Sequence, residues 1–404
     1  GAVSVGGSDR LVDPGLAAVW GLGRVAALEV PDRWGGLVDL PEVLDVRAGA
    51  RLAGVLAAGG GGEDQVAVRG SGVFGRRLVR AVPAGAVDAS WNPCPSGTVL
   101  VTGGTGALGV EVARWLAGRG VPHLVLTSRR GVAPEGLVEE LSGLGARVTV
   151  VACDVADREA LAEVVAGVPV DVPLMGVVHA AGVVDDGLLE GLSSERLVSV
   201  MAPKVDGLVN LDVVTSGLPV EWLVVFSSLA GTVGSAGQGN YAAANACVDA
   251  WVEWRRGRGL PAVSVAWGPW AEGGMAAGGV VVERLRRGGV RPLDVEFALR
   301  VFAEAVRGGV DVTVADIDWE RFVPGFASAR PSRLLAELPE VAAVVPALPA
   351  GGGGPGLRDQ LEGVPDGRRR QVLLDVVRAQ AAAVLGHAGA QAVEPDRAFR
   401  DLGF

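Results

Sequence analysis

Residues 98–109, TVLVTGGTGALG, form a short apolar run that ends in a glycine-rich turn. The amphipathic segment 110–118 follows at once, so the pattern predicts a strand, a tight loop and a helix. In such a loop the glycines let the backbone approach a pyrophosphate, and the helix N-terminus supplies amide hydrogens. The GxxGxxG spacing therefore predicts a dinucleotide site; the alternative is an ordinary glycine turn. The predicted loop contacts are Thr102, Gly103, Thr105, Gly106, Ala107 and Leu108.

Strand-like and helix-like runs alternate on both sides of this loop, which predicts an α/β protein with a doubly wound, parallel, Rossmann-like sheet. The strand candidates are 99–101, 123–127, 147–153, 176–179, 222–227, 262–267 and 310–315. A second, incomplete series precedes them, with strand-like runs at 2–5 and 37–40, helical runs at 14–29 and 46–58, and a strand-rich tail at 65–81. Because this series has neither a glycine loop nor a cluster of acids, bases or nucleophiles, we expect it to be structural.

The 404 residues are therefore divided into a structural unit (1–90), a catalytic unit (91–330), a Pro/Gly-rich linker (331–357) and the start of a small domain (358–404). A net charge of −10, with no basic run longer than three residues, argues against nucleic-acid binding. The uncharged segment 222–248 contains many glycine, serine and asparagine residues, so we expect no membrane span. The three cysteines lack metal-ligand spacing, and a reducing cytoplasm is the expected location.

The residues after the second strand predict which cofactor binds. Where an NAD enzyme places an acidic residue, this chain has Ser128, Arg129 and Arg130. Guanidinium groups fit a 2′-phosphate, which favours NADPH; the alternative is that both arginines are solvated loop residues. The remaining predicted cofactor contacts, which follow later strands, are Asp154, Val155, Ala180, Ala181, Gly182 and Pro269.

Lys204 is the only lysine and Tyr241 the only tyrosine of the chain. Reduction of a ketone needs a proton donor near the carbonyl oxygen and a cation that stabilises the phenolate left behind. Tyr241 lies 13 residues after Ser228, at the head of a predicted helix. The YxxxK motif of short-chain dehydrogenases is not met, because Asn245 occupies the lysine position and the ammonium group lies upstream at Lys204.

This exchange of Asn and Lys is accompanied by the motifs SRRG (128–131), HAAGV (179–183) and GQGNYAAANA (237–246). In these features the chain resembles the ketoreductase domain of modular type I polyketide synthases, a branch of the short-chain dehydrogenase/reductase superfamily. The resemblance covers the whole chain and implies NADPH-dependent reduction of a 3-ketoacyl thioester during polyketide elongation. It also implies the roles of four residues. Tyr241 would be the general acid, Ser228 would orient the substrate carbonyl, Lys204 would lower the phenol pKa and contact the nicotinamide ribose, and Asn245 would hold a water of the proton relay.

The resemblance also implies a larger assembly. Residues 1–90 look like a structural subdomain that lacks its opening strands, and 394–404 look like an acyl carrier domain cut before its phosphopantetheine attachment serine. The implied partners are the carrier domain of the same module, an acyltransferase and, in some modules, a dehydratase.

The resemblance extends to stereochemistry. B-type members carry Leu-Asp-Asp ahead of the lysine, and this chain has Val184, Asp185 and Asp186; the alternative is a solvated acidic loop. A-type members carry Trp eight residues before the tyrosine, where this chain has Val233. Asn240 is also B-like, and Ala243 stands where epimerising members have Pro, so the implied product is the D-3-hydroxyacyl thioester without epimerisation. The other predicted substrate residues are Gln238 and, in a glycine-rich lid at 272–279, Met275.

Two other functions compete with this interpretation. One is a free-standing dehydrogenase of small ketones, against which the structural unit and the carrier-like tail argue. The other is a reductively inactive scaffold or epimerase, against which the complete set of Lys204, Ser228, Tyr241 and Asn245 argues.

Overall fold

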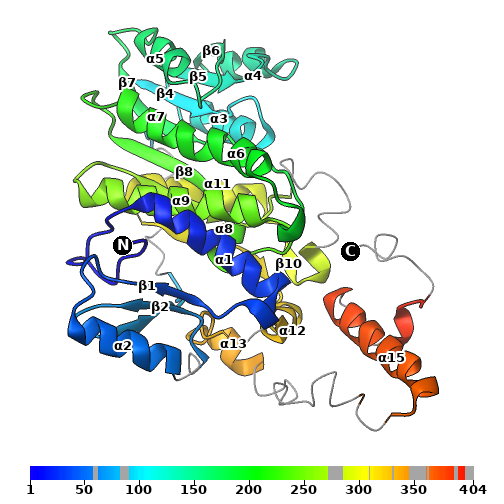
Figure 1. Ribbon diagram of the computed structural model, residues 1–404. Coiled ribbons are helices and arrows are strands. Elements are labelled where there is room, and N and C mark those ends of the chain that lie inside the picture. Colours follow the sequence, from blue (N-terminus) through cyan, green and yellow to red (C-terminus); the bar gives the residue numbers. More distant parts are fainter. Residues whose placement is uncertain are drawn as a thin grey trace.

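A computed structural model describes residues 1–57, 62–81, 91–271, 285–308, 310–329, 332–344, 361, 364–385 and 390–395. Its centre is a seven-stranded parallel sheet with the strand order β11-β9-β8-β7-β4-β5-β6 (Figure 1). The strands are β4 (Thr98–Thr102), β5 (His123–Ser128), β6 (Arg147–Ala152), β7 (Leu174–His179), β8 (Trp222–Ser228), β9 (Val263–Trp267) and β11 (Val312–Val314). The predicted doubly wound α/β sheet is confirmed.

Helices cover both faces of this sheet, which explains why its strands are almost continuously apolar. Along β4, Val99 and Val101 pack into the apolar cluster on one face and Leu100 into the cluster on the other. The helices of this part are α3 (Ala107–Gly118), α4 (Leu137–Gly143), α5 (Arg158–Ala166), α6 (Ser194–Met201), α7 (Gly207–Val214), α8 (Leu229–Val233), α9 (Gly239–Gly257) and α11 (Val295–Gly308).

The N-terminal unit, residues 1–81, has its own small sheet in the order β1-β2-β3. Its elements are η1 (Pro14–Leu16), α1 (Ala17–Glu29), η2 (Pro31–Arg33), β1 (Leu37–Asp39), α2 (Val46–Ala57), β2 (Gln65–Val68) and β3 (Val73–Gly75). Helix α1 packs along α9, one of the helices that cover the large sheet (Figure 1). A Cβ on Gly21 would lie 2.2 Å from the Ala242 carbonyl oxygen, so only glycine permits this close approach.

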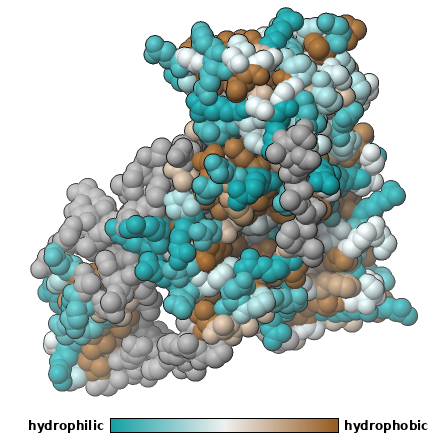
Figure 2. All heavy atoms as spheres, turned by 180° about the vertical axis from the view of Figure 1, so that it is seen from behind, coloured by the Kyte–Doolittle hydropathy of each residue, from teal (hydrophilic) through white to brown (hydrophobic). Residues whose placement is uncertain are grey.

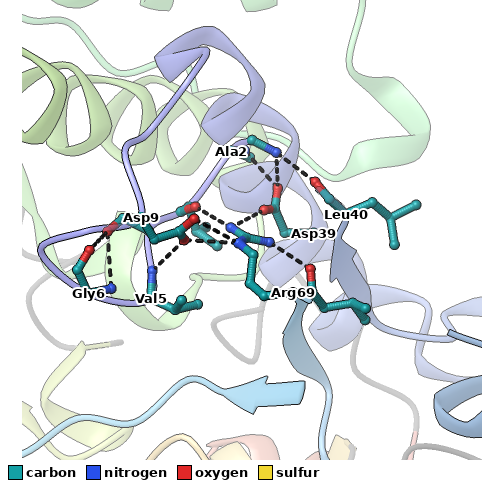
Figure 3. A network of polar contacts seen from close by, with 11 residues as sticks. Ala2, Val5, Gly6, Asp9, Asp39, Leu40 and Arg69 are labelled. Atoms are coloured by element: carbon teal, nitrogen blue, oxygen red, sulfur yellow. Dashed lines mark hydrogen bonds and ion pairs between the residues drawn. The ribbon is translucent and has the colours of Figure 1, made fainter. Parts of the chain in front are cut away.

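The strand predicted at 2–5 is wrong. Its amides donate to carboxylates instead of to a neighbouring strand: Ala2 N lies 2.7 Å from Asp39, and Val5 N lies 2.9 Å from Asp9. Arg69 pairs with both carboxylates, at 2.7 Å to Asp39 and 2.9 Å to Asp9 (Figure 3). These ion pairs therefore fix the segment as an irregular loop.

The described C-terminal residues add two short strands, three further α-helices and a short 3₁₀ helix. They are β10 (Val290–Arg291), which pairs antiparallel with β12 (Asp316–Ile317), then α12 (Trp319–Ala329), α13 (Pro339–Val344), α15 (Asp366–Leu385) and η8 (Ala390–Ala392). Helix α15 lies at the periphery (Figure 1) and forms the lobe at the lower left of the rear view, where brown apolar atoms are visible (Figure 2). Its Leu373 and Val377 are exposed. None of the described helices combines the length and apolarity that crossing a bilayer requires.

Candidate active site

The glycine-rich loop lies at the carboxyl end of β4 and has the shape of a cradle. Gly103 has a φ of +68°, and a Cβ there would lie 2.9 Å from the Ala180 carbonyl. A Cβ on Gly109 would lie 2.3 Å from the Gly103 oxygen. Gly106 precedes α3 and provides no side-chain cap, which leaves first-turn amides of this helix available to an anionic ligand. The loop therefore fits a dinucleotide pyrophosphate.

The other predicted cofactor residues follow the ends of neighbouring strands, so they lie along the same edge of the sheet. Arg129 and Arg130 are exposed after β5, where the Ser128 hydroxyl accepts from Gly131 N at 3.2 Å. Asp154 is exposed after β6 and accepts from the Ala156 amide at 3.0 Å. Two of the remaining predicted residues form backbone hydrogen bonds: Ala180 N donates to Thr102 O at 3.1 Å, and Pro269 O accepts from Leu293 N at 2.7 Å. The other three differ in exposure, since Val155 is buried, Ala181 is half-buried and Gly182 is exposed.

Lys204 lies in a five-residue π-helical turn, Ala202–Asp206, between α6 and α7. It is 4% exposed, its Nζ donates to the Phe226 carbonyl at 2.9 Å, and Nζ is 5.4 Å from the centre of the Tyr241 ring. Burial lowers the pKa of Lys204 to about 8, and the charge of Asp249 opposes this shift. A Cβ on Gly182 would lie 2.9 Å from Lys204 Cε, so the lysine side chain can occupy this position because residue 182 has no side chain.

Tyr241 is the third residue of α9 and only 7% exposed. Burial raises the pKa of its phenol to about 12, and the side chains of Ser228 and Asn245 partly oppose this shift. The phenol is therefore protonated at neutral pH and available as an acid. Ser228 ends β8, and its hydroxyl oxygen accepts from Ala230 N at 3.2 Å.

Asn245 lies one turn after Tyr241 on α9, and its amide group donates to the Tyr241 carbonyl at 2.7 Å. Its Oδ1 is buried and accepts no hydrogen bond from any described residue. Because buried oxygens are normally hydrogen-bonded, this atom fits an additional polar ligand such as a water. The structure thus brings Lys204, Ser228, Tyr241 and Asn245 together beside the glycine-rich loop.

His179, which ends β7 and begins the HAAGV motif, has a role in the site that its sequence position did not predict. Its Nε2 donates to the Lys204 carbonyl at 2.8 Å, and its Nδ1 accepts from the Thr102 hydroxyl at 2.8 Å. The carbonyl can only accept, which fixes this tautomer. Burial lowers the pKa of His179 to about 4, so the neutral ring connects the end of β4 to the turn that carries Lys204.

The predicted stereocontrol residues form a polar network beside α9. Asp185 forms a bidentate ion pair with Arg196 at 2.7 and 2.8 Å, and Asp186 accepts from Gln238 Nε2 at 3.1 and 3.2 Å. Asn240 donates to the Asp185 carbonyl at 2.9 Å and accepts from Tyr241 N at 2.8 Å. Asp185 and Asp186 are thus connected to the head of the helix that carries Tyr241.

Two of the predicted substrate residues, Val233 and Met275, are not among those that the structure places beside Tyr241. Val233 ends α8 and packs with Val290 and Val323, in a different apolar cluster from Tyr241. Met275 and the predicted lid lie outside the described residues. Among the described residues, no group of three His, Cys, Asp or Glu side chains is placed to hold a metal ion.

Two family descriptions match the chain. The KR domain matches residues 97–272, and the family "Polyketide synthase extender module SpnB, Rossmann fold domain" matches residues 1–78. Polyketide synthase GfsA from Streptomyces halstedii is 52% identical over 413 residues, covering 100% of this chain and 6% of that protein. Pikromycin polyketide synthase component PikAIII from Streptomyces venezuelae is 45% identical over 420 residues, covering 100% of this chain and 27% of that protein. The chain thus spans a small part of the relatives that it matches.

Solved structures give the same assignment. A structure of A-type ketoreductases from a modular polyketide synthase is 49% identical with a TM-score of 0.81, and the match covers 85% of this chain and 73% of that one. The first ketoreductase of the tylosin synthase is 48% identical with a TM-score of 0.77, and the match covers 85% and 74%. A fold of this kind contains the seven-stranded sheet, the glycine-rich loop and the group around Tyr241. The chain therefore belongs to the ketoreductase domains of modular polyketide synthases, which are oxidoreductases that reduce β-keto groups.

Proposed function

We propose that this chain uses NADPH to reduce a 3-ketoacyl thioester, carried on the phosphopantetheine arm of an acyl carrier domain, to the D-3-hydroxyacyl thioester. The observation that carries the proposal is the buried Lys204 ammonium 5.4 Å from the ring centre of Tyr241, beside the glycine-rich loop. The proposal is supported by an acid and a stabilising cation that lie beside Gly182, one of the predicted cofactor residues.

When bound in the cradle, NADPH supplies the hydride for the ketone carbon. Tyr241 donates its phenolic proton to the substrate oxygen, and the Ser228 hydroxyl orients that carbonyl. The positive charge of Lys204 stabilises the phenolate that remains. Burial raises the pKa of the free phenol, and the side chains of Ser228 and Asn245 oppose that rise. The Asn245 oxygen holds a water through which Tyr241 regains its proton.

The choice of NADPH rests on Arg129 and Arg130, which are exposed at the end of β5. We expect the double variant Arg129→Ala/Arg130→Ala to raise the KM for NADPH about 10- to 100-fold, because charge-assisted hydrogen bonds to the 2′-phosphate are lost. The KM for NADH and kcat should change little. Arg47→Ala, which removes an exposed arginine on α2, is the matched control. An unchanged preference for NADPH would show that these arginines are only solvated.

The proposed D-configuration rests on local residues, namely Asp186 with its partner Gln238, Asn240, and Val233 in place of a tryptophan. The A-type structures share the fold over 85% of this chain, a likeness that does not depend on these few residues. We expect Asp186→Ala to lower the ratio of D- to L-alcohol about tenfold, since the contact to Gln238 is lost. Chiral chromatography of the product measures this ratio, with Asp32→Ala, an exposed carboxylate after α1, as control. An unchanged ratio would exclude Asp186 from stereocontrol.

The parent assembly is part of the proposal. We propose that residues 1–90 are a structural subdomain, 91–330 the catalytic subdomain and 358–404 the start of an acyl carrier domain. The exposed Leu373 and Val377 on α15 support the last assignment, because an apolar stripe of this kind needs further helices to cover it. The carrier domain, an acyltransferase and, in some modules, a dehydratase are the proposed partners.

The first part of the predicted linker 331–357 is folded instead, because Leu334, Leu335 and Leu338 are buried in an apolar cluster and α13 follows them. We therefore propose that the linker begins after α13.

A further inference from the structure

We infer that Glu29, the last residue of α1 in the N-terminal unit, is a positioning residue for the stereochemical course of the reduction. Its carboxylate joins the two loops that carry Asp186 and Gln238. This inference rests on the proposed function and adds a residue from a unit whose sequence predicts only a structural role.

Each oxygen of Glu29 accepts from a different loop. Oε2 accepts from the Leu189 amide at 2.7 Å, and Oε1 accepts from the Gly237 amide at 2.7 Å. Leu189 lies three residues after Asp186 and begins the short helix η4 (Leu189–Gly191), and Gly237 immediately precedes Gln238. The partly buried carboxylate therefore fixes both loops to the end of α1.

The two loops also contact each other directly. Gly187 N donates to Gly237 O at 2.7 Å, and Gly187 pairs with Gln238 in an isolated parallel bridge. A Cβ on Gly239 would lie 2.5 Å from Leu189 and 3.1 Å from Leu22 of α1, so apolar packing reinforces the same junction. Glu29 thus acts at the place where the distance between Asp186 and the head of α9 is set.

Glutamate meets both requirements of this position, which are two acceptor oxygens and sufficient reach. Both partners are backbone donors, and an ionised carboxylate offers two acceptor oxygens. Glutamine would present an NH₂ group to one of the two amides, and aspartate is one methylene too short to keep the same reach to both. Either substitution should release one loop and let Asp186 move relative to Tyr241.

The test compares Glu29→Gln and Glu29→Asp with Glu190→Gln, which removes an exposed carboxylate from η4. For both Glu29 variants we expect the D:L product ratio to fall about tenfold and the KM for the thioester to rise, while kcat and the KM for NADPH change less than twofold. A merely structural residue would change the melting temperature without changing the product ratio. The control should match the wild type.

Amide hydrogen exchange separates the inference from the proposed function, because it needs no turnover. We expect faster exchange at Leu189 or Gly237 in the Glu29 variants and not in Glu190→Gln. Faster exchange with an unchanged product ratio and KM would overturn the positioning role, and unchanged exchange would overturn the bridge itself. Failure of the wild type to form the D-alcohol would instead refute the proposed function, whatever the exchange shows. If Glu29→Gln does not fold, the milder Glu29→Asp provides the same comparison.

Discussion

Replacement of Tyr241 by phenylalanine is expected to lower kcat about 10²- to 10⁴-fold, the range that a positioned general acid contributes. The ring stays in its buried place on α9, so the apolar contacts with Val200, Ala230 and Ala244 are retained. Only the proton donor is lost, and phenylalanine has no group that replaces it. The rate of NADPH consumption with a 3-ketoacyl thioester measures the effect.

Two controls make this result specific. Binding of NADPH and the melting temperature of Tyr241→Phe should stay close to the wild type, because the cradle and the core are unchanged. Ser216→Ala, which removes an exposed hydroxyl after α7, should keep full activity. Retention of more than a tenth of wild-type kcat by Tyr241→Phe would exclude the phenol as the proton donor.

Replacement of Lys204 by methionine is expected to lower kcat about 10²- to 10³-fold, comparable to the loss of one preorganised electrostatic group. Burial lowers the pKa of this ammonium from 10.5 to about 8. The cation is therefore present below pH 8 and is lost as the pH rises above it, whereas Tyr241, with a pKa of about 12, stays protonated. The wild-type rate should fall as the pH rises through about 8, and the variant should lose this alkaline limb.

The conservative variant Lys204→Arg should not restore the activity. Gly182 lies against the lysine side chain, where a Cβ would come within 2.9 Å of Cε, so the pocket has little room for a guanidinium group. A pH profile of Lys204→Met that keeps the same alkaline limb would show that another group titrates there. Full activity of Lys204→Met would remove the cation from the mechanism.

Much of the large sheet was predictable from the sequence because its inner strands β4, β5, β7, β8 and β9 are buried and form nearly continuous apolar runs. The glycine-rich loop was equally clear, since the close approaches of Gly103 and Gly109 tolerate no side chain. Lys204 and Tyr241 were conspicuous because each is the only residue of its type. Local sequence thus predicted these features, and the structure places the two side chains beside each other.

The sequence could not show features that depend on distant contacts. Residues 2–5 are apolar like a strand, but carboxylates from other segments bind their amides. His179 has a role only because Thr102 and the Lys204 carbonyl lie on either side of its ring. Glu29 looks like an ordinary charged helix end, yet its partners lie 160 and 208 residues further along the chain.

The most direct experiment is the NADPH-dependent conversion of a 3-ketoacyl thioester, with chiral analysis of the alcohol, for the wild type and Tyr241→Phe side by side. We expect rapid turnover to the D-alcohol by the wild type and almost none by the variant. The L-alcohol would leave the reductase in place and contradict the role of Asp186. Binding of NADPH without any reduction by the wild type would contradict the proposed reductase and favour a scaffold or epimerase.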